Sequence, residues 1–350
     1  MAESDHEGQV PSKAQGVACF GEMLLRLSAP ASERLLQSPQ LAARFGGAEA
    51  NVAVSLAALG HPARMITTLP DNPIGQAAAA ELGRYGVDAQ FALVRPGRMG
   101  LYFLTPGAVL RPSDVLYDRA MSAFAETDPL AFDFKAALHD CAWLHMSGIT
   151  PAVGANAAEA ALLAVATAHK LGMSVSFDGN YRAKMWAAWN GQAVEVLNSL
   201  ISGADILFGN ELDIGLALGR TFDDPQPVLR RQQAAEAAFE AFPRLKRICS
   251  TFRTEHAVTR HDVSAMMATR DSLHLTPVAR LEGIVDRIGT GDAFAAGVLH
   301  GLISGQDDVR ALHFGWAACA YKHSIPGDFN LASEADLADV LSDSGMHVRR

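Results

Sequence analysis

The chain is poor in cysteine, and it lacks several motifs that would assign a function at once. Its four cysteines stand far apart among 350 residues, and none forms a Cys-x-x-Cys pair. Disulfide-rich and zinc-binding modules need closer spacing, so we interpret the cysteines as buried thiols of a reducing compartment. The sequence also contains no His-Glu-x-x-His metal motif and no Gly-Lys dipeptide of a Walker A loop.

Basic residues are outnumbered by acidic ones, which limits the partners to be expected. The chain has 29 Lys and Arg against 38 Asp and Glu, a net charge of −9 and a pI near 5.7. Nucleic acids and anionic membranes are bound by basic surfaces, so we expect neither as a partner. No long uncharged apolar run or signal-peptide pattern stands out, and we expect a cytoplasmic protein. An anionic small molecule would have to be held locally, by arginines and helix starts.

What the chain does have is a regular alternation of short apolar runs and helical runs. Strands are predicted at 17–27, 63–69, 143–146, 173–177, 206–208 and 247–251, and helices at 48–59, 73–85, 155–171, 192–201 and 232–241. Short buried strands that alternate with helices indicate an α/β fold, with a mostly parallel sheet covered on both faces. One domain is expected over residues 15–345. Residues 1–14 are polar and aperiodic and are predicted to be a disordered tail.

Two segments interrupt this alternation, at about 29–45 and 97–123. The second contains the β-like runs 101–104 and 115–117 on either side of a stretch with proline and glycine. Long insertions in a compact domain are usually binding loops or lids. We therefore predict that these segments form a lid that keeps water from a reacting centre.

The most informative segment is 286–297, with the sequence DRIGTGDAFAAG. Gly289, Thr290 and Gly291 form a turn, and Asp292 stands at the start of a helix rich in small residues. Free N–H groups at such a helix start converge on an anion, and glycine lets the anion approach closely. The adjacent carboxylate can accept a proton from a hydroxyl, so the segment favours phosphoryl transfer to an alcohol. We expect Asp292 to be ionised at pH 7, because a helix start lowers the pKa of a carboxyl group.

A simpler interpretation of this segment is also open. Gly-x-Gly-Asp before a helix is often only a turn whose acidic residue is favoured by the helix dipole. A dinucleotide fingerprint, in contrast, would need a third glycine where Phe294 stands, and it would lie nearer the start of the fold. What remains is a nucleotide site of a different type, or a plain turn.

A second segment, 45–54 with the sequence FGGAEANVAV, lies near the other end of the chain. Together the two segments resemble the paired signatures of the pfkB (ribokinase-like) family of carbohydrate kinases, and the likeness extends from about Cys19 to Asp328. Shorter stretches at 20–28, 117–120, 178–182 and 325–330 look most like the 2-keto-3-deoxygluconate kinases. The resemblance implies a ribokinase-like three-layer α/β/α fold with a small β lid.

The resemblance also implies roles for individual residues. Asp292 would be the catalytic base, and the backbone of Gly289, Thr290 and Gly291 would hold the transferred phosphoryl group. Substrate contacts are implied for Gly46, Gly47, Asn51, Tyr102, Tyr117, Arg119 and Arg182. The two arginines match the carboxylate of a sugar acid, which a neutral sugar lacks. Apart from the family, the same residues could be a helix-start turn and exposed arginines without a ligand.

For the nucleotide, the resemblance implies ATP contacts from Asn210, Ser250, Thr251, Arg253, Gly289, Gly291 and Ala318. The loop 325–328 would border the adenine. Mg²⁺ is expected because it bridges phosphate oxygens with few protein ligands. Glu211 and Asp213 are its candidate ligands, through water, although the family has an Asn-x-x-Glu element where Asp213 ends the motif here. A monovalent cation near Asp286 is a further candidate cofactor.

The implied activity is ATP-dependent phosphorylation of the terminal hydroxyl of 2-dehydro-3-deoxy-D-gluconate, that is, a 2-dehydro-3-deoxygluconokinase. The galactonate-derived acid, which differs at one stereocentre, fits the same pattern. Two alternatives are kept: a kinase of the same family for a neutral sugar such as fructose or ribose, and a non-catalytic protein that binds sugar or nucleotide. A homo-oligomer is expected, because lids in this family often pair across subunits.

Overall fold

A ten-stranded sheet forms the centre of the molecule. The structure, a computed structural model, describes residues 16–342, so the predicted tail at 1–14 lies outside the described residues. The sheet has the order β15-β14-β13-β12-β11-β10-β1-β4-β6, with β16 paired to β14. Its strands are β1 (Gly16–Phe20), β4 (Ala63–Ile66), β6 (Val87–Asp88), β10 (Cys141–Ser147), β11 (Ser174–Asp178), β12 (Ile206–Phe208), β13 (Arg247–Ala257), β14 (Arg260–Ala268), β15 (Leu273–Leu275) and β16 (Ala279–Glu282). The pairs from β6 to β13 are parallel, and β13 to β16 are joined in antiparallel pairs.

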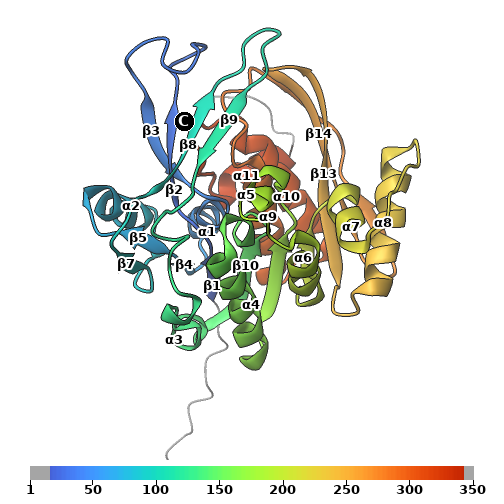
Figure 1. The fold of residues 1–350 in the computed structure, drawn as a ribbon. Coiled ribbons are helices and arrows are strands. Elements are labelled where there is room, and N and C mark those ends of the chain that lie inside the picture. The colour runs from blue at the N-terminus through green and yellow to red at the C-terminus, as the bar shows by residue number, and fades with distance from the viewer. Residues whose placement is uncertain (1–15, 343–350) are drawn as a thin grey trace, which may run out of the picture.

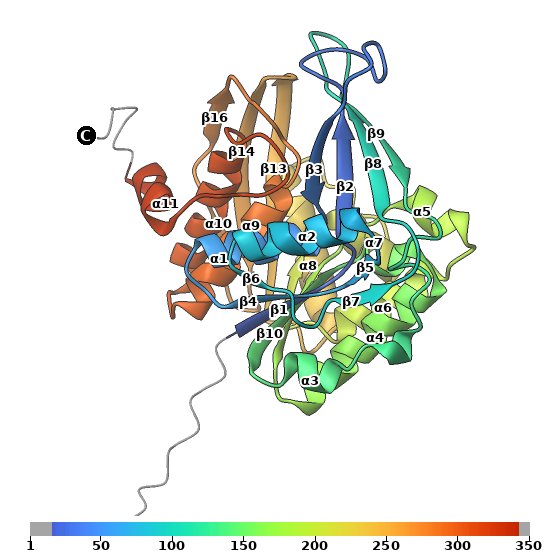
Figure 2. The ribbon, with the colours of Figure 1, turned by 90° about the vertical axis from the view of Figure 1, so that its left-hand side faces the viewer.

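Helices cover both faces of this sheet (Figures 1 and 2). One face carries α1 (Ala48–Ala58), α2 (Pro73–Arg84), α9 (Thr290–Ile303), α10 (Asp308–Lys322) and α11 (Glu334–Leu341). The other carries α3 (Phe134–Leu138), α4 (Ala155–Lys170), α5 (Ala183–Ala188), α6 (Ala193–Ser202), α7 (Glu211–Leu218) and α8 (Pro227–Ala241), with short 3-10 turns at Pro129–Ala131 and Pro151–Val153. Side chains along a strand alternate between two hydrophobic cores, as Ile206 and Phe208 against Leu207 illustrate. The predicted three-layer α/β/α fold is therefore confirmed.

A second, four-stranded sheet in the order β3-β2-β8-β9 stands above one end of the central sheet (Figure 1). Its strands are β2 (Leu24–Ser28), β3 (Ala42–Gly46), β8 (Gly100–Thr105) and β9 (Asp114–Asp118), and we call this sheet the lid. β5 (Thr68–Pro70) and β7 (Leu93–Arg95) form a separate two-stranded sheet. No helix within residues 16–342 is long and apolar enough to cross a membrane.

The first predicted strand is wrong in one respect. Residues 17–27 do not form one strand, because the chain leaves the central sheet after Phe20 and enters the lid at Leu24. The buried carboxylate of Glu22 lies at this break and accepts a hydrogen bond from Arg119, 2.6 Å away. The continuous apolar pattern hid this change of sheet. Strand β2 thus belongs to the lid, although it lies outside the two segments predicted to form one.

Candidate active site

Two adjoining cavities open at the carboxyl edge of the parallel strands, where α/β proteins bind ligands. The first has a volume of about 260 Å³ and lies between the lid and the start of α9. The second has a volume of about 380 Å³ and lies beside the start of α7 and the strand β13. They share Asp178, Asn180, Arg182 and Gly291 in their walls. Two ligands bound in these cavities would therefore meet near Gly291.

Asp292 lies in the wall of the first cavity, at the start of α9. Asn51, from the first helix of the chain, donates a hydrogen bond to its Oδ2 over 2.6 Å. Burial raises the pKa of Asp292 to about 7, and this exceeds the lowering by Asn51. The expectation of a low pKa was wrong, because desolvation of the carboxyl group in the cavity wall outweighs the effect of the helix start. At neutral pH this carboxyl group is poised between its two protonation states, as a general base should be.

The backbone at the start of α9 is held in a conformation that favours glycine. Gly289 has a φ of 78°, and a Cβ added there would lie 2.1 Å from the carbonyl oxygen of Asp328. No side chain caps this helix, so the N–H groups of its first turn lack a capping acceptor. Gly289, Thr290 and Gly291 all line the first cavity. An anion placed there would meet several N–H donors at once.

The glycine pair before α1 serves close packing. A Cβ on Gly47 would lie 2.4 Å from the carbonyl oxygen of Glu22, and one on Gly46 would lie 2.1 Å from the carboxylate of Asp328. Gly47 and Asn51 line the first cavity, whereas Gly46 does not. Asn51 Oδ1 is buried without a hydrogen-bond partner among residues 16–342. It is therefore an acceptor available to a ligand hydroxyl.

The lid contributes Tyr102, Tyr117 and Arg119 to the first cavity. Tyr102 and Tyr117 are paired across β8 and β9, and their ring centres are 6.1 Å apart. The Tyr102 hydroxyl donates a hydrogen bond to the carboxylate of Asp328. Arg119 is largely balanced, because its Nε donates to Glu22 over 2.6 Å and only 5% of its side chain is exposed. Sequence reasoning did not foresee this ion pair.

Arg182 differs from the other arginines of the first cavity. Its Nη1 donates to the carbonyl oxygen of Tyr181, and it forms no ion pair with any acidic side chain in the described part of the chain. Arg287, in contrast, is paired with Glu255 over 2.7 Å. Arg182 is thus the arginine in this wall whose charge remains available to an anionic ligand.

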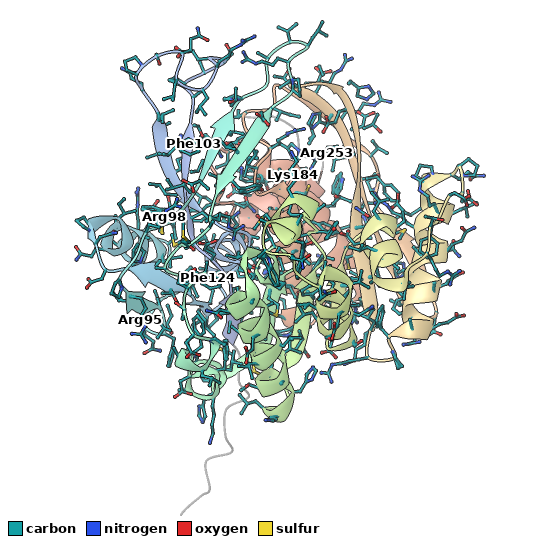
Figure 3. The ribbon with its side chains drawn as sticks, viewed as in Figure 1. Arg95, Arg98, Phe103, Phe124, Lys184 and Arg253 are labelled. Carbon is teal, nitrogen blue, oxygen red and sulfur yellow. The ribbon has the colours of Figure 1, made fainter. Side chains whose placement is uncertain are left out.

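The residues predicted to bind ATP fall into two groups. Asn210, Ser250, Thr251 and Gly291 line the second cavity, and Gly289 lines the first. Arg253, on the β13 side of the molecule (Figure 3), donates to Thr290 at the start of α9. Ala318 lies elsewhere, because it is fully buried in the core between α10 and α9. It lines neither cavity, so that expectation was wrong.

The two candidate magnesium ligands also differ. Glu211 is bound to Arg230 and Arg231, each at 3.0 Å, and lines neither cavity. Asp213 lines the second cavity, where its Oδ2 accepts the backbone N–H of Asn210 in a capping box. No cluster of three or more His, Cys, Asp or Glu side chains suited to a metal occurs within residues 16–342. The ion pairs of Glu211 exclude it as a ligand in this conformation.

Three residues of the site were not singled out from the sequence. Asp178 ends β11 and lies in the walls of both cavities, and burial raises its pKa well above the ordinary value. Asp328 belongs to a loop expected beside the adenine, but it lines the first cavity instead. Arg26 lies in the lid strand β2 and is paired with Asp286 and Asp328. Arg26 lies on the same face of its strand as the buried residues Leu24 and Ser28. Its pairing left no signal in the sequence, because its partners lie 260 and 302 residues away.

A carboxyl group with a raised pKa, a helix start open to an anion and two joined cavities are what group transfer between two bound ligands needs. The chain belongs to the pfkB family of carbohydrate kinases, because the sequence model of that family matches residues 14–328. It is similar to the 2-dehydro-3-deoxygalactonokinase of Haloferax volcanii, at 34% identity over 92% of this chain and 95% of that protein.

Solved structures of other proteins are also similar to this chain. The crystal structure of 2-dehydro-3-deoxygluconokinase from Thermotoga maritima has a TM-score of 0.89 and 36% identity, covering 94% of this chain and 99% of that one. A putative ribokinase II from E. coli, solved with ATP and Mg²⁺, shares the fold with a TM-score of 0.78 and 20% identity, over 94% of this chain and 99% of its own.

Proposed function

We propose that the protein transfers the γ-phosphoryl group of ATP to the terminal hydroxyl of 2-dehydro-3-deoxy-D-gluconate. The observation that carries this proposal is the meeting of three groups in one cavity: Asp292 with its Asn51 partner, the start of α9, and the unpaired charge of Arg182. Two relatives with more than 30% identity support it, since one is named a 2-dehydro-3-deoxygalactonokinase and the other a 2-dehydro-3-deoxygluconokinase.

In the proposed reaction the sugar acid lies in the first cavity and ATP in the second. Asn51 orients the attacking hydroxyl, and Asp292 accepts its proton as the new P–O bond forms. The N–H groups of Gly289 to Asp292 hold the oxygens of the transferred phosphoryl group, and ADP leaves from the second cavity. Since the transition state of phosphoryl transfer is loose, the base needs only to orient the hydroxyl and take its proton late.

The carboxylate of the substrate is assigned chiefly to Arg182. Guanidinium groups bind carboxylates with two parallel hydrogen bonds, and Arg182 has donors to spare. Arg119 would assist only through its terminal nitrogens, since Nε is held by Glu22. The ion pair of Arg119 with Glu22 leaves less positive charge for a substrate carboxylate. It therefore favours keeping a neutral-sugar kinase as a second candidate.

The residues present fit Mg²⁺ in part. We propose that Asp213, with Asp178 beside it in the wall of the second cavity, holds the ion through water. When bound there, the ion would offset the negative charge of the ATP phosphates. Glu211 is not proposed, because its two oxygens are engaged by arginines.

The residues around Asp286 do not fit a monovalent cation. Asp286 Oδ2 already accepts from Arg26 and from the backbone N–H of Gly327, and Oδ1 accepts from the N–H of Ile288. A cation placed there would also lie against the guanidinium of Arg26. We therefore do not assign such an ion to this chain.

We also propose a cytoplasmic homo-oligomer that pairs through the lid. Leu116, on β9, has 58% of its surface exposed, and four of the five residues of this strand are exposed. Light scattering measures the mass in solution, and replacing Leu116 by Asp should reduce it to that of a monomer. An unchanged mass would place the subunit contact elsewhere.

A coupled assay of ADP release across a panel of acceptors tests the reaction. We expect turnover with 2-dehydro-3-deoxygluconate or its galactonate epimer, and little with fructose or ribose. Asp292→Asn should lower kcat by about 10³-fold or more, while ATP still binds. Turnover confined to neutral sugars would overturn the assignment of a sugar acid as the substrate. ATP binding without turnover of any acceptor would indicate a binding protein.

Arg182→Ala tests the assignment of the substrate carboxylate. It should raise the KM for the sugar acid by about 10- to 100-fold, because a charge-assisted hydrogen bond is lost, and should leave the KM for ATP within about twofold. Lys184→Ala is the matched control, since Lys184 is an exposed cation two residues away that lines neither cavity. Equal effects of the two variants would remove Arg182 from the substrate site.

A further inference from the structure

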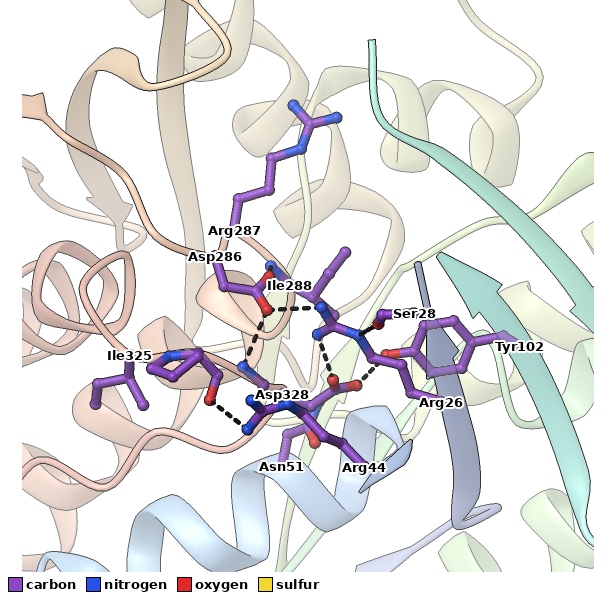
Figure 4. Close-up of polar contacts among 12 residues, drawn as sticks. Arg26, Ser28, Arg44, Asn51, Tyr102, Asp286, Arg287, Ile288, Ile325 and Asp328 are labelled. Carbon is purple, nitrogen blue, oxygen red and sulfur yellow. Dashed lines mark hydrogen bonds and ion pairs between the residues drawn. The ribbon is translucent and has the colours of Figure 1, made fainter. Parts of the chain in front are cut away.

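Arg26 is a buried cation that the reaction described above does not use. It lies in β2 of the lid with 5% of its surface exposed. Its Nε donates to Ser28 over 2.7 Å, Nη1 to Asp328 over 2.9 Å and Nη2 to Asp286 over 2.7 Å (Figure 4). Every nitrogen of the guanidinium therefore has a partner. Burying a charge is costly, and the cost is offset only where the ion pairs and hydrogen bonds have good geometry.

The two carboxylates that Arg26 joins flank the start of α9. Asp286 fixes the approach to the helix start through the N–H of Ile288, which precedes Gly289. Asp328 packs its carbonyl oxygen into the space that a side chain at Gly289 would fill. The same carboxylate of Asp328 accepts from Tyr102 of the lid (Figure 4). Arg26 thus connects the lid to both sides of the turn that is proposed to hold the phosphoryl group.

The charge at this place is set by the protein itself. Burial alone would lower the pKa of Arg26, but Asp286 and Asp328 outweigh it and raise the pKa above its ordinary value. A second buried cation, Lys322, donates through Nζ to the carbonyl oxygen of Ile325 over 2.9 Å. Carboxylates and backbone carbonyls are the groups that would coordinate a metal cation. Here the carboxylate of Asp286 and the carbonyl of Ile325 are already bound to side-chain cations.

We propose that Arg26 is the fixed cation of the phosphoryl-transfer site, a positioning residue that takes the place of a bound monovalent cation. It offsets part of the negative charge of Asp286 and Asp328, which would otherwise repel the phosphates of ATP, and it keeps the turn 289–292 in register with the lid. It does not touch the substrate. The test by kcat, described next, rests on the proposed function. The test by melting temperature, which detects binding of a cation, does not.

The kinetic test compares salts at one ionic strength, with ATP supplied as its Tris salt. Wild-type kcat should agree within about twofold between potassium, sodium and tetramethylammonium chloride, since the site carries its own charge. Arg26→Ala should lower kcat at least about tenfold with a smaller change in the KM of the sugar acid, because positioning and not binding is lost. Potassium or methylguanidinium should restore part of that kcat, whereas tetramethylammonium should not.

Arg44→Ala is the matched control for Arg26→Ala. Arg44 lies directly opposite Arg26 across β2 and β3, yet it is exposed, and its one side-chain hydrogen bond within residues 16–342 goes to the carbonyl oxygen of Pro326, at 3.5 Å. Its variant should keep wild-type kcat in every salt. Wild-type kcat that depends on potassium, or normal kcat in Arg26→Ala, would overturn the proposal.

Melting curves of the wild-type protein decide the matter even if Arg26→Ala does not fold. A cation that binds only the native state raises the melting temperature. Equal melting temperatures in potassium and tetramethylammonium chloride support the fixed cation, and a higher one in potassium overturns it. If no sugar acid is phosphorylated in any salt, the proposed function fails, and this binding test still stands.

Discussion

At the scale of single residues, the protonation of Asp292 is the feature with the most consequences. Desolvation raises its pKa to about 7, while the hydrogen bond from Asn51 and the charge of Arg182 oppose the shift. A base must be deprotonated to accept the hydroxyl proton. Its pKa therefore sets the pH below which the proposed kinase loses activity.

We expect kcat/KM for the sugar acid to rise with pH and level off above about 7, where Asp292 has lost its proton. Below that pH it should fall about tenfold per unit, since only the deprotonated fraction reacts. The measurement is initial rate against pH with MgATP saturating and the acid varied. An inflection near pH 4, the range of an ordinary aspartate, would show that the carboxyl group is not desolvated during turnover.

The raised pKa also predicts that Asp292 costs stability. Its folded-state pKa lies above the unfolded value, so the protonated form favours folding. The ionic form lowers the free energy of unfolding as pH rises from about 4 to about 7. Asp292→Asn should therefore melt higher than wild type at pH 8, by on the order of 2–5 °C, with no gain near pH 4. Calorimetry at both pH values checks this, and a less stable variant at pH 8 would contradict it.

At the scale of elements, much of the fold could be predicted because the signals are local. Predicted strands at 206–208 and predicted helices at 48–59 and 73–85 agree with β12, α1 and α2 within one residue at each end. The break between β1 and β2 was missed because Glu22 is satisfied by Arg119, about 97 residues later. The pairing of Arg26 and the pKa of Asp292 depend on long-range burial in the same way. Local patterns carry no record of such contacts.

The start of α9 offers an element-scale prediction from two neighbouring glycines. Gly289→Ala should destabilise the fold by about 2 kcal/mol or more, because φ is 78° and the new Cβ meets the Asp328 carbonyl at 2.1 Å. In Gly291→Ala the new Cβ meets no atom within 4 Å, so the free energy of unfolding should stay the same or rise by up to about 1 kcal/mol. Its methyl group would instead enter the junction of the two cavities and raise the KM for ATP. Thermal melts of both variants test this, and equal losses would argue against the backbone account.

At the scale of the whole molecule, the two sheets differ greatly in how they are stabilised. The central sheet lies between two large cores, whereas the lid core consists of Leu24, Tyr102 and Leu104 with Val115 and Ile288 packed beside it. Few buried apolar contacts mean a low free energy of local opening. The lid nevertheless supplies Tyr102, Tyr117 and Arg119 to the first cavity. Substrate binding should therefore order the least stable part of the molecule.

Hydrogen exchange read by mass spectrometry tests this division. Without ligands, amides of β8 and β9 should exchange faster than those of β11, which is covered on both faces. The sugar acid with a non-hydrolysable ATP analogue should slow exchange in β8 and β9 at least about tenfold and leave β11 unchanged, because ligand contacts add to the small lid core. The Arg182→Ala variant should bind the sugar acid more weakly while its lid stays intact. It should therefore need a higher concentration of the sugar acid to reach the same protection. Protection spread evenly over both sheets would mean that the lid and the central domain open as one unit.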